Sequence, residues 1–316
     1  MDLEITRKNE TPFRLSEFGI IVKDIIVESI EIDDNYEDKE NHNGRLLLSS
    51  QYRKRKITVP AFFKVTKMND IPRMRDLLYS LVVDTDQYYV REIRRKSRQN
   101  YDFIQPTEEE YQPINEFGDP IYNDTPDNYE VLVSGKRYQV KCTGVINPEQ
   151  KTDDIVAFDL EFETVELPFA ESIGTSLDLE RDLDGAYWAY DTSLPFNELN
   201  NRRQYTFNNT NSFYVYYHGD VPNDQFNLYK KVTIILGKDT KSFQWNLTHS
   251  DLMTIDDIEL KKGDKIEYDG IQTYRNGIPI NNESNLAQPK FKNGWNDFEF
   301  NQVVKKVVFD MKFYYK

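Results

Sequence analysis

The stretch from Phe158 to Ser176 constrains the fold more than any other part of this chain, because a strand pattern ends there in an apolar connector. Its first seven residues, FDLEFET, alternate apolar with polar or acidic side chains, which is the period of a strand with one face on a core and one face in water. The residues that follow, VELPFA, are too apolar for a flexible tether and too short for a helix. We therefore expect a connector held against protein surface, with Pro168 and Phe169 as the joint between two β-rich domains.

The length supports two domains. A chain of 316 residues exceeds the usual size of a single domain, so two units of roughly 150 residues each are the default expectation. We place them at 1–170 and 171–316. The 21 Tyr and 19 Phe give large contact areas, which is typical of strands that are covered on one side or that meet partners.

The first half shows β-strands and one helix. From Ile57 to Val65 apolar side chains alternate with polar ones, and Pro60 within this run predicts an edge strand or a bulge because proline cannot donate to a ladder. Asn69 and Asp70 then precede apolar residues at helical spacing, with Pro72 in the first turn. This pattern predicts one amphipathic helix of about 12 residues.

The second half consists of short strands and turns. Strands are predicted at 213–217, 231–236, 243–247, 265–268 and 303–313, with Gly-containing turns between them. The fold class is therefore mainly β, and the second domain is predicted to be an antiparallel β-sandwich or jelly roll.

The residue types speak against several function classes. A net charge of −14 argues against a protein that coats nucleic acid, and the single cysteine cannot form an intramolecular disulfide. The three His are scattered, and the chain has no GxSxG, phosphate loop or HExxH. We expect no enzyme activity, no catalytic residue, no metal site and no cofactor. With no signal peptide or membrane span visible, we expect assembly in a cytosol without membrane insertion.

Charge in the first half is sorted along the sequence. From Ser50 to Arg98 there are 13 Lys and Arg against 5 Asp and Glu, whereas 101–135 holds nine acids and no Lys or Arg. Solvated faces with a long loop explain this pattern, and so do contacts between the acidic stretch of one subunit and the basic stretch of its neighbour. The candidate residues for such contacts are Arg53, Arg55, Arg91, Arg94, Arg95, Glu108, Glu109 and Glu110.

Aromatic residues in the second half are candidates for stacking on sugar rings. Trp188, Tyr190 and Trp295 are the candidates, whereas Trp245 alternates with Phe243 and Leu247 and is expected in the core. The alternative function is therefore a carbohydrate-binding protein that attaches to host cell-wall glycans through the second domain.

Several motifs of the first half together resemble a known family. They are FGIIVKDI at 18–25, Gly44-Arg45, RKITVP at 55–60, RDLL at 75–78, GKRY at 135–138 and FDLEFET with PFA at 158–170. In order and spacing they resemble the N-terminal domain of siphophage distal tail proteins, and the staphylococcal-phage versions most of all. The long acidic stretch has no counterpart in that pattern.

The resemblance implies a structural role in a virion, assembled in the host cytoplasm. It implies a homo-hexameric ring whose N-terminal domain, a tail-tube-like sandwich or split barrel, continues the channel for DNA. It implies a peripheral galectin-like C-terminal domain. The implied partners are the major tail tube protein, the tape measure protein, the tail-associated lysin and receptor-binding proteins, with DNA only in transit. A host glycan is an additional candidate partner because of the aromatic residues named above.

Overall fold

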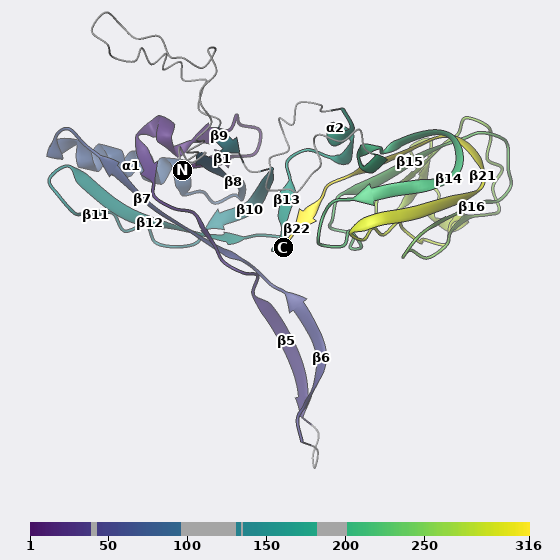
Figure 1. The fold of residues 1–316 in the computed structure, drawn as a ribbon, viewed down its shortest axis with the longest axis horizontal. Helices are drawn as coiled ribbons and strands as arrows, with labels where there is room; N and C mark the ends of the chain where they lie inside the picture. Colours follow the sequence, from purple (N-terminus) through teal and green to yellow (C-terminus); the bar gives the residue numbers. More distant parts are fainter. Residues whose placement is uncertain (39–42, 96–130, 134, 182–200) are drawn as a thin grey trace, which may run out of the picture.

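The computed structural model describes residues 1–38, 43–95, 131–133, 135–181 and 201–316. Two β-rich lobes lie side by side, and a long two-stranded hairpin projects from the region between them (Figure 1). The C-terminus returns to this same region, so the middle of the molecule is built from three distant parts of the sequence.

The first lobe is an antiparallel sheet with an inner path β2-β1-β8-β10-β12-β7-β3. The remaining strands flank it, with β4 on β7, β9 on β8, β11 on β12, and β13 joined to both β10 and β22. The strands that the structure describes here are β1 (Asp2–Thr6), β2 (Phe13–Arg14), β3 (Ile20–Val22), β4 (Ile26–Val27), β7 (Lys56–Lys64), β8 (Tyr88–Arg95), β9 (Val131–Val133), β10 (Lys136–Cys142), β11 (Glu149–Gln150), β12 (Ile155–Thr164), β13 (Ala170–Ser172) and β22 (Tyr314–Tyr315).

Alternation along β7 and β12 builds the core of this lobe. Every second residue of each strand is buried, and the two strands pair over nine positions, from Ile155 opposite Lys64 to Glu163 opposite Lys56. The predicted helix is present as α1 (Ile71–Val82), with Pro72 in its first turn and Leu78, Leu81 and Val82 buried against the same core. The 3-10 turns η1 (Leu15–Phe18) and η2 (Met68–Asp70) precede β3 and α1.

Pro60 lies in an inner strand, so of the two predicted settings, an edge strand or a bulge, the edge strand was wrong. Strand β7 pairs with β12 on one side and with β3 and β4 on the other. The carbonyl of Pro60 accepts from the backbone N–H of Lys23 at 2.9 Å, on the side of β3 and β4. Since N–H and C=O of one residue point to the same neighbour in an antiparallel strand, the missing N–H of Pro60 falls at the break between β3 and β4.

The second lobe is a curled antiparallel sheet organised by one long strand. Strand β21 pairs with β14 along one edge, and on its other edge it pairs first with β16 and then with β15. The described strands are β14 (Thr206–Tyr217), β15 (Lys230–Leu236), β16 (Phe243–Leu247), β17 (Met253–Ile255), β18 (Lys265–Tyr268), β19 (Thr273–Arg275), β20 (Ile278–Pro279) and β21 (Gly294–Met311). The short helix α2 (Ser176–Arg181) and the 3-10 turns η6 (Asn201–Arg203) and η7 (Asn281–Glu283) complete the lobe.

Aromatic rings fill the core of the second lobe. Phe298 and Phe309 lie 5.0 Å apart between ring centroids, and Trp245 packs at 5.6 Å from Phe300. Trp245 is 1% exposed, in the core position expected from the sequence. Edge-to-face and offset ring pairs of this kind add about 0.5–1.5 kcal/mol each beyond the burial of their area.

The mainly β fold class predicted from the sequence is confirmed, with a sandwich-like second half. Four of the runs predicted as strands after residue 200 lie within β14, β15, β16 and β18, and the run 303–313 lies in β21 as far as Met311. Helix α2 was not predicted, because its six residues are too few to show helical periodicity. The likeness to galectins stays a prediction.

His218 makes the second lobe sensitive to acid. Burial lowers the pKa of His218 from 6.5 to about 4. The positive charges of Arg202 and Arg203 lower this pKa as well, whereas the hydrogen bond to the Arg202 carbonyl raises it. The Nε2–H of His218 donates to that carbonyl at 2.9 Å. Because the unfolded chain takes up this proton first, the stabilisation is complete above pH 6.5 and is lost as pH falls toward 4.

We expect the unfolding free energy to drop by on the order of 2 kcal/mol between pH 6.5 and 4 through this one group. His218→Gln keeps a donor for the Arg202 carbonyl but cannot titrate, so its pH profile should be flatter by that amount in urea unfolding. His249→Asn is the control, since His249 is exposed and lies at φ 71°, where Asn is tolerated. Equal slopes for wild type and His218→Gln would contradict the assignment.

Candidate functional site

The hairpin formed by β5 (Ile32–Asp38) and β6 (Arg45–Tyr52) is the most exposed regular element described. Every residue of both strands is exposed, and the hairpin pairs with no other sheet among the described residues. It projects away from both lobes (Figure 1). A two-stranded hairpin alone is marginally stable in water, so this geometry points to a surface outside the single chain.

One face of the hairpin carries apolar side chains toward both ends, with the hydrogen-bonded pair Asp34 and Ser50 between them. Ile32 pairs with Tyr52, and Tyr36 pairs with Leu47, which places all four side chains on the same face. Leu48 follows at the bulge that separates the two pairs. These five side chains are 44–53% exposed, a large apolar contribution from an element with no core of its own.

The root of the hairpin meets the connector and the C-terminus in a small cluster of its own. Phe169, 7% exposed, packs with Val221, Leu228 and Tyr314, and its ring lies 5.5 Å from that of Tyr52. Partly buried Ile30 and Leu167 close the cluster. Pro168 is buried beside Phe169. Pro168 and Phe169, the predicted joint residues, are therefore both buried. The cluster around Phe169 is separate from the two large hydrophobic cores.

A cluster of charged side chains also ties the connector to the C-terminal part of the chain. Glu171 in β13 accepts from Arg137 of β10 at 2.7 Å and from Lys312 at 2.5 Å. Burial lowers the pKa of Lys312, and the charge of Glu171 opposes that shift. One carboxylate thus ties the first sheet to the C-terminal end of β21, beside the strand pairs Arg137–Glu171 and Glu171–Tyr314.

The basic residues predicted as contacts between subunits have partners within the chain. Arg53 pairs with Asp33 of the hairpin, Arg91 with Glu4 at 3.4 Å, and Arg94 with Glu92. Arg55 is 5% exposed and its guanidinium lies 5.6 Å from the ring of Tyr138. The predicted acidic partners Glu108, Glu109 and Glu110, and the side chain of Arg95 at the end of β8, lie outside the described residues.

The sugar-stacking candidates are only partly described. Trp188 and Tyr190 lie outside the described residues, whereas Trp295 is 43% exposed on β21. The structure brings Phe213 and Tyr214 of β14 and Asp297 of β21 next to Trp295 in one hollow. Sequence reasoning missed Phe213, Tyr214 and Asp297, because the alternation of apolar and polar residues does not show which strands are neighbours.

Sequence reasoning also missed the hairpin. The run RLLLSSQY at 45–52 has three consecutive Leu, which hides the period of two, and the bulge at Leu48 breaks it. The Asn43-Gly44 pair before the run is typical hairpin turn chemistry and was the available signal.

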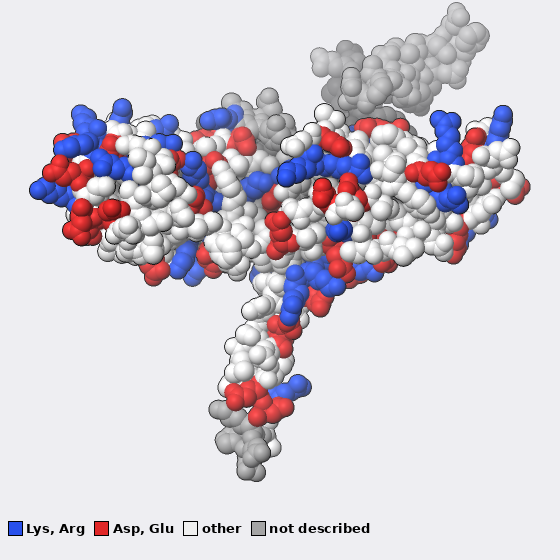
Figure 2. Space-filling model, turned by 180° about the vertical axis from the view of Figure 1, so that it is seen from behind, with Lys and Arg blue, Asp and Glu red and all other residues white. Residues whose placement is uncertain are grey.

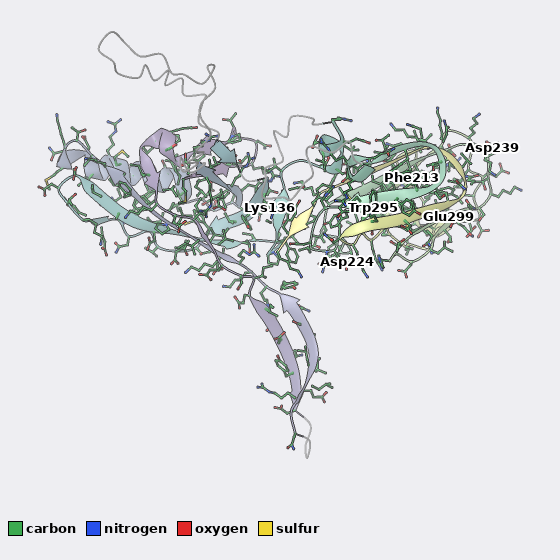
Figure 3. All side chains as sticks on the ribbon, in the orientation of Figure 1. Lys136, Phe213, Asp224, Asp239, Trp295 and Glu299 are labelled. Atoms are coloured by element: carbon green, nitrogen blue, oxygen red, sulfur yellow. The ribbon has the colours of Figure 1, made fainter. Side chains whose placement is uncertain are left out.

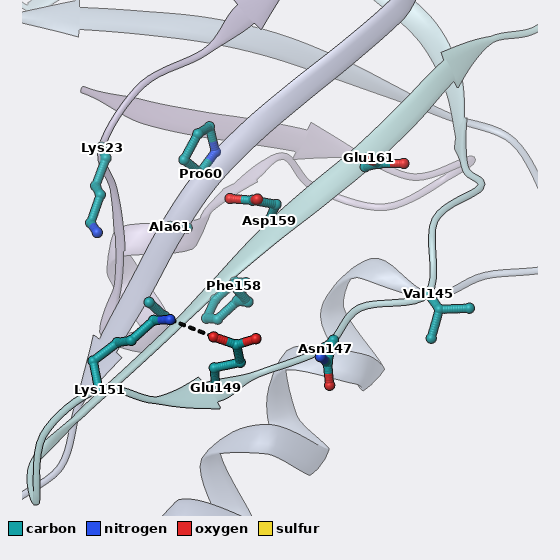
Figure 4. A pocket seen from close by; sticks show the side chains of 11 residues that line it. Lys23, Pro60, Ala61, Val145, Asn147, Glu149, Lys151, Phe158, Asp159 and Glu161 are labelled. Atoms are coloured by element: carbon teal, nitrogen blue, oxygen red, sulfur yellow. Dashed lines mark hydrogen bonds and ion pairs between the residues drawn. The ribbon is translucent and has the colours of Figure 1, made fainter.

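A polar hollow of about 360 Å³ lies on the outer face of β7 and β12, near β11 (Figure 4). Its charged groups include Lys23, Asp159 and a pair formed by Glu149 and Lys151. Glu161 at its rim is bound to Lys56 at 3.0 Å. Among the described residues its lining holds no His, Cys, Ser or Thr, and we assign it no chemistry.

Within the described ranges, no three His, Cys, Asp or Glu side chains gather in a way that suits a metal ion. None of the helices described there is long and apolar enough to cross a membrane. Lys and Arg are interspersed with Asp and Glu over the face drawn in Figure 2, so that face carries no extended field of one sign.

Two matches from the comparison with known proteins bear on the fold. Residues 11–164 match the family described as the phage tail protein RIFT-related domain. The crystal structure of the SPP1 Dit protein, described as a paradigm of the hub of the adsorption apparatus in phages that infect Gram-positive bacteria, aligns with a TM-score of 0.58 at 10% identity. That alignment covers 98% of this chain and 99% of the other.

The other comparisons carry less. The baseplate of phage P2 in its activated conformation with Ca aligns over 99% of this chain and 97% of the other, at 7% identity and a TM-score of 0.35, which is too low to argue from. A search of curated proteins found no significant match. The resemblance to siphophage distal tail proteins is confirmed by the first two matches, and the likeness to staphylococcal-phage versions stays a prediction.

Proposed function

We propose that this chain, a member of the siphophage distal tail protein family, acts as the structural hub of a virion, at the distal end of the tail where tube and baseplate meet. Its role is to position other components, without catalysis. The family match over residues 11–164 and the shared fold of the SPP1 Dit hub support this role, and the hairpin β5–β6 supports a mechanism for it.

The mechanism is self-assembly into a closed ring. On the apolar face of the hairpin, Ile32, Leu47 and Leu48 belong to none of the hydrophobic clusters of the described chain, whereas Tyr52 packs on Phe169 at the root. A neighbouring copy would cover this face, and a ring repeats that contact until no hairpin is left uncovered. Six copies and a central channel for DNA are what the family resemblance implies.

The same proposal includes the partners. The first lobe, which holds the matched family domain, would stack on the tail tube protein around the tape measure protein. The second lobe would lie at the periphery near the tail-associated lysin and receptor-binding proteins, with the boundary between domains at 170/171. Under this proposal the protein lies in the virion tail after assembly in the host cytoplasm.

Light scattering on the full chain over a range of salt tests the ring. We expect a mass of six chains, and a mass that falls at high salt if contacts between the basic stretch 53–95 and the acidic stretch 108–110 hold the ring, because salt screens exposed charges. A ring that is indifferent to salt assigns the contact to the apolar hairpin instead. A chain that stays monomeric with tail tube protein and lysin present would overturn the proposal.

A further inference from the structure

The solvent face of the second lobe carries a strip of aromatic and carboxylate side chains across β14, β21 and β16. Register places Tyr216 opposite Trp295, Tyr214 opposite Asp297, and Ser212 opposite Glu299. Asn246 of β16 lies opposite Glu299 from the other side. Residues directly opposite in antiparallel strands point to the same face, so all of these side chains share one surface.

The aromatic end of this strip is ordered by its own ring contacts. The ring of Trp295 lies 5.1 Å from Tyr216 at 85° between planes, and 6.3 Å from Tyr214 at 78°. Trp295 is 43% and Tyr214 53% exposed. The edge-to-face contacts fix the indole while much of its surface stays open to solvent, which is how a stacking platform has to be presented.

The polar end of the strip follows directly along β21. Asp297 and Glu299 have no hydrogen bond or ion pair from their carboxylates to any described residue, although the backbone of Asp297 is bound to Thr248. From Trp295 to Glu299 the strand rises about 13 Å. Trp295 and Glu299 lie on the same strand near Phe213 (Figure 3).

Two adjoining hollows follow the strip. One of about 350 Å³ is lined by Phe213, Tyr214, Trp295 and Asp297. The other, of about 490 Å³, continues past Asp297 to Glu299 and Asn246. Each lies within the size range of small-ligand sites, and together they join apolar rings to acceptors that lack donors.

The chemistry of the strip selects among possible occupants. An apolar protein surface would bury two carboxylates without a donor, which is costly, and protein interface cores are depleted in charged residues. Phosphate-bearing polymers would be repelled by Asp297 and Glu299. A neutral sugar provides a C–H face for the indole and several O–H donors for the carboxylates, which form strong charge-assisted hydrogen bonds.

We propose that the strip formed by Tyr214, Tyr216, Trp295, Asp297 and Glu299 binds a neutral, hydroxyl-rich oligosaccharide. The sugar ring stacks on Trp295, and its hydroxyl groups donate to Asp297 and Glu299. The amide of Asn246 serves a neighbouring hydroxyl or acetamido group. The site lies within one chain and does not depend on the ring.

The test titrates the full chain with N-acetylglucosamine, glucose and galactose trisaccharides at up to about 5 mM, by calorimetry and by tryptophan fluorescence. We expect at least one trisaccharide to bind with a dissociation constant near the millimolar range. Trp295→Ala should weaken it at least about tenfold, and Glu299→Gln, which keeps shape and removes charge, about threefold or more. Phe226→Ala is the matched control, since Phe226 is 73% exposed and lies off the strip.

Circular dichroism melting of each variant separates loss of binding from loss of fold. Binding to a neutral sugar should also be nearly the same in low and high salt. Failure of all three trisaccharides to bind, or equal affinity for wild type and Trp295→Ala, would overturn the proposal. Binding of a basic protein that salt removes, without sugar binding, would reassign the strip to a protein partner and overturn it as well.

Discussion

Leu47→Asp with Leu48→Asp is expected to abolish the ring while leaving the single chain folded. Both side chains are about half exposed on the hairpin β5–β6, 51% and 53%, so the monomer loses little packing. In the proposed ring they are covered by the next copy, and burying a carboxylate there without a partner costs several kcal/mol. The association constant of each contact should fall by about a hundredfold or more.

Light scattering measures this directly, with wild type at the mass of the ring and the double variant at the mass of one chain. Thermal melting of the variant should shift by no more than about 2 °C. Val145→Asp is the matched control, because Val145 is 95% exposed on the first lobe away from the hairpin. Where rings form only during assembly, the same comparison is made by complementing a phage that lacks its own copy. A double variant that assembles like wild type would contradict the role of the hairpin.

Phe169→Ser is expected to loosen the joint before either lobe unfolds. Phe169 packs in the cluster with Val221, Leu228 and Tyr314, apart from both large cores. Removing a buried phenyl ring costs about 3 kcal/mol, and here that loss falls on the contacts between the lobes. The remaining ties are the short strand β13 and the Glu171 ion cluster.

Hydrogen exchange gives the sharpest measurement of this effect. The amide of Ser172 donates to the Phe313 carbonyl at 2.8 Å, and that of Val221 to Tyr314 at 3.1 Å. Both should exchange about a hundredfold faster in Phe169→Ser, since local opening becomes easier by the lost packing. Amides at the centre of β12, such as that of Leu160, should be unchanged.

Two further variants bracket this interpretation. Phe169→Leu keeps an apolar side chain in the cluster and should retain most of the protection. Phe226→Ser removes an exposed phenyl ring elsewhere and should change nothing. If Phe169→Ser instead exposes the amides of β12, the connector belongs to the first core and the proposed boundary at 170/171 lies too early.

Local patterns in the sequence predicted the elements that bury one face. The alternation in 57–65 and 158–164 became parts of β7 and β12, and the helical spacing after Asp70 became α1, because burial of one face requires that period whatever the partner is. Pro60 shows the limit of that reasoning. The missing N–H of Pro60 leaves no hydrogen bond unmade, because it lies at the break between β3 and β4. No local sequence pattern predicts where that break falls.

The sequence by itself determined a mainly β chain, the strand that leads into the connector, a connector held against protein surface at Pro168 and Phe169, and the motifs that resemble siphophage distal tail proteins. Only the tertiary structure decided which residues from distant parts of the chain pack together. Residues 30, 52, 169 and 314 form one cluster, and residues 214, 295 and 299 form one strip, because sheet pairing brings together segments that are far apart in the chain. Strand periodicity specifies which face a residue occupies, and it leaves open which strand becomes the neighbour.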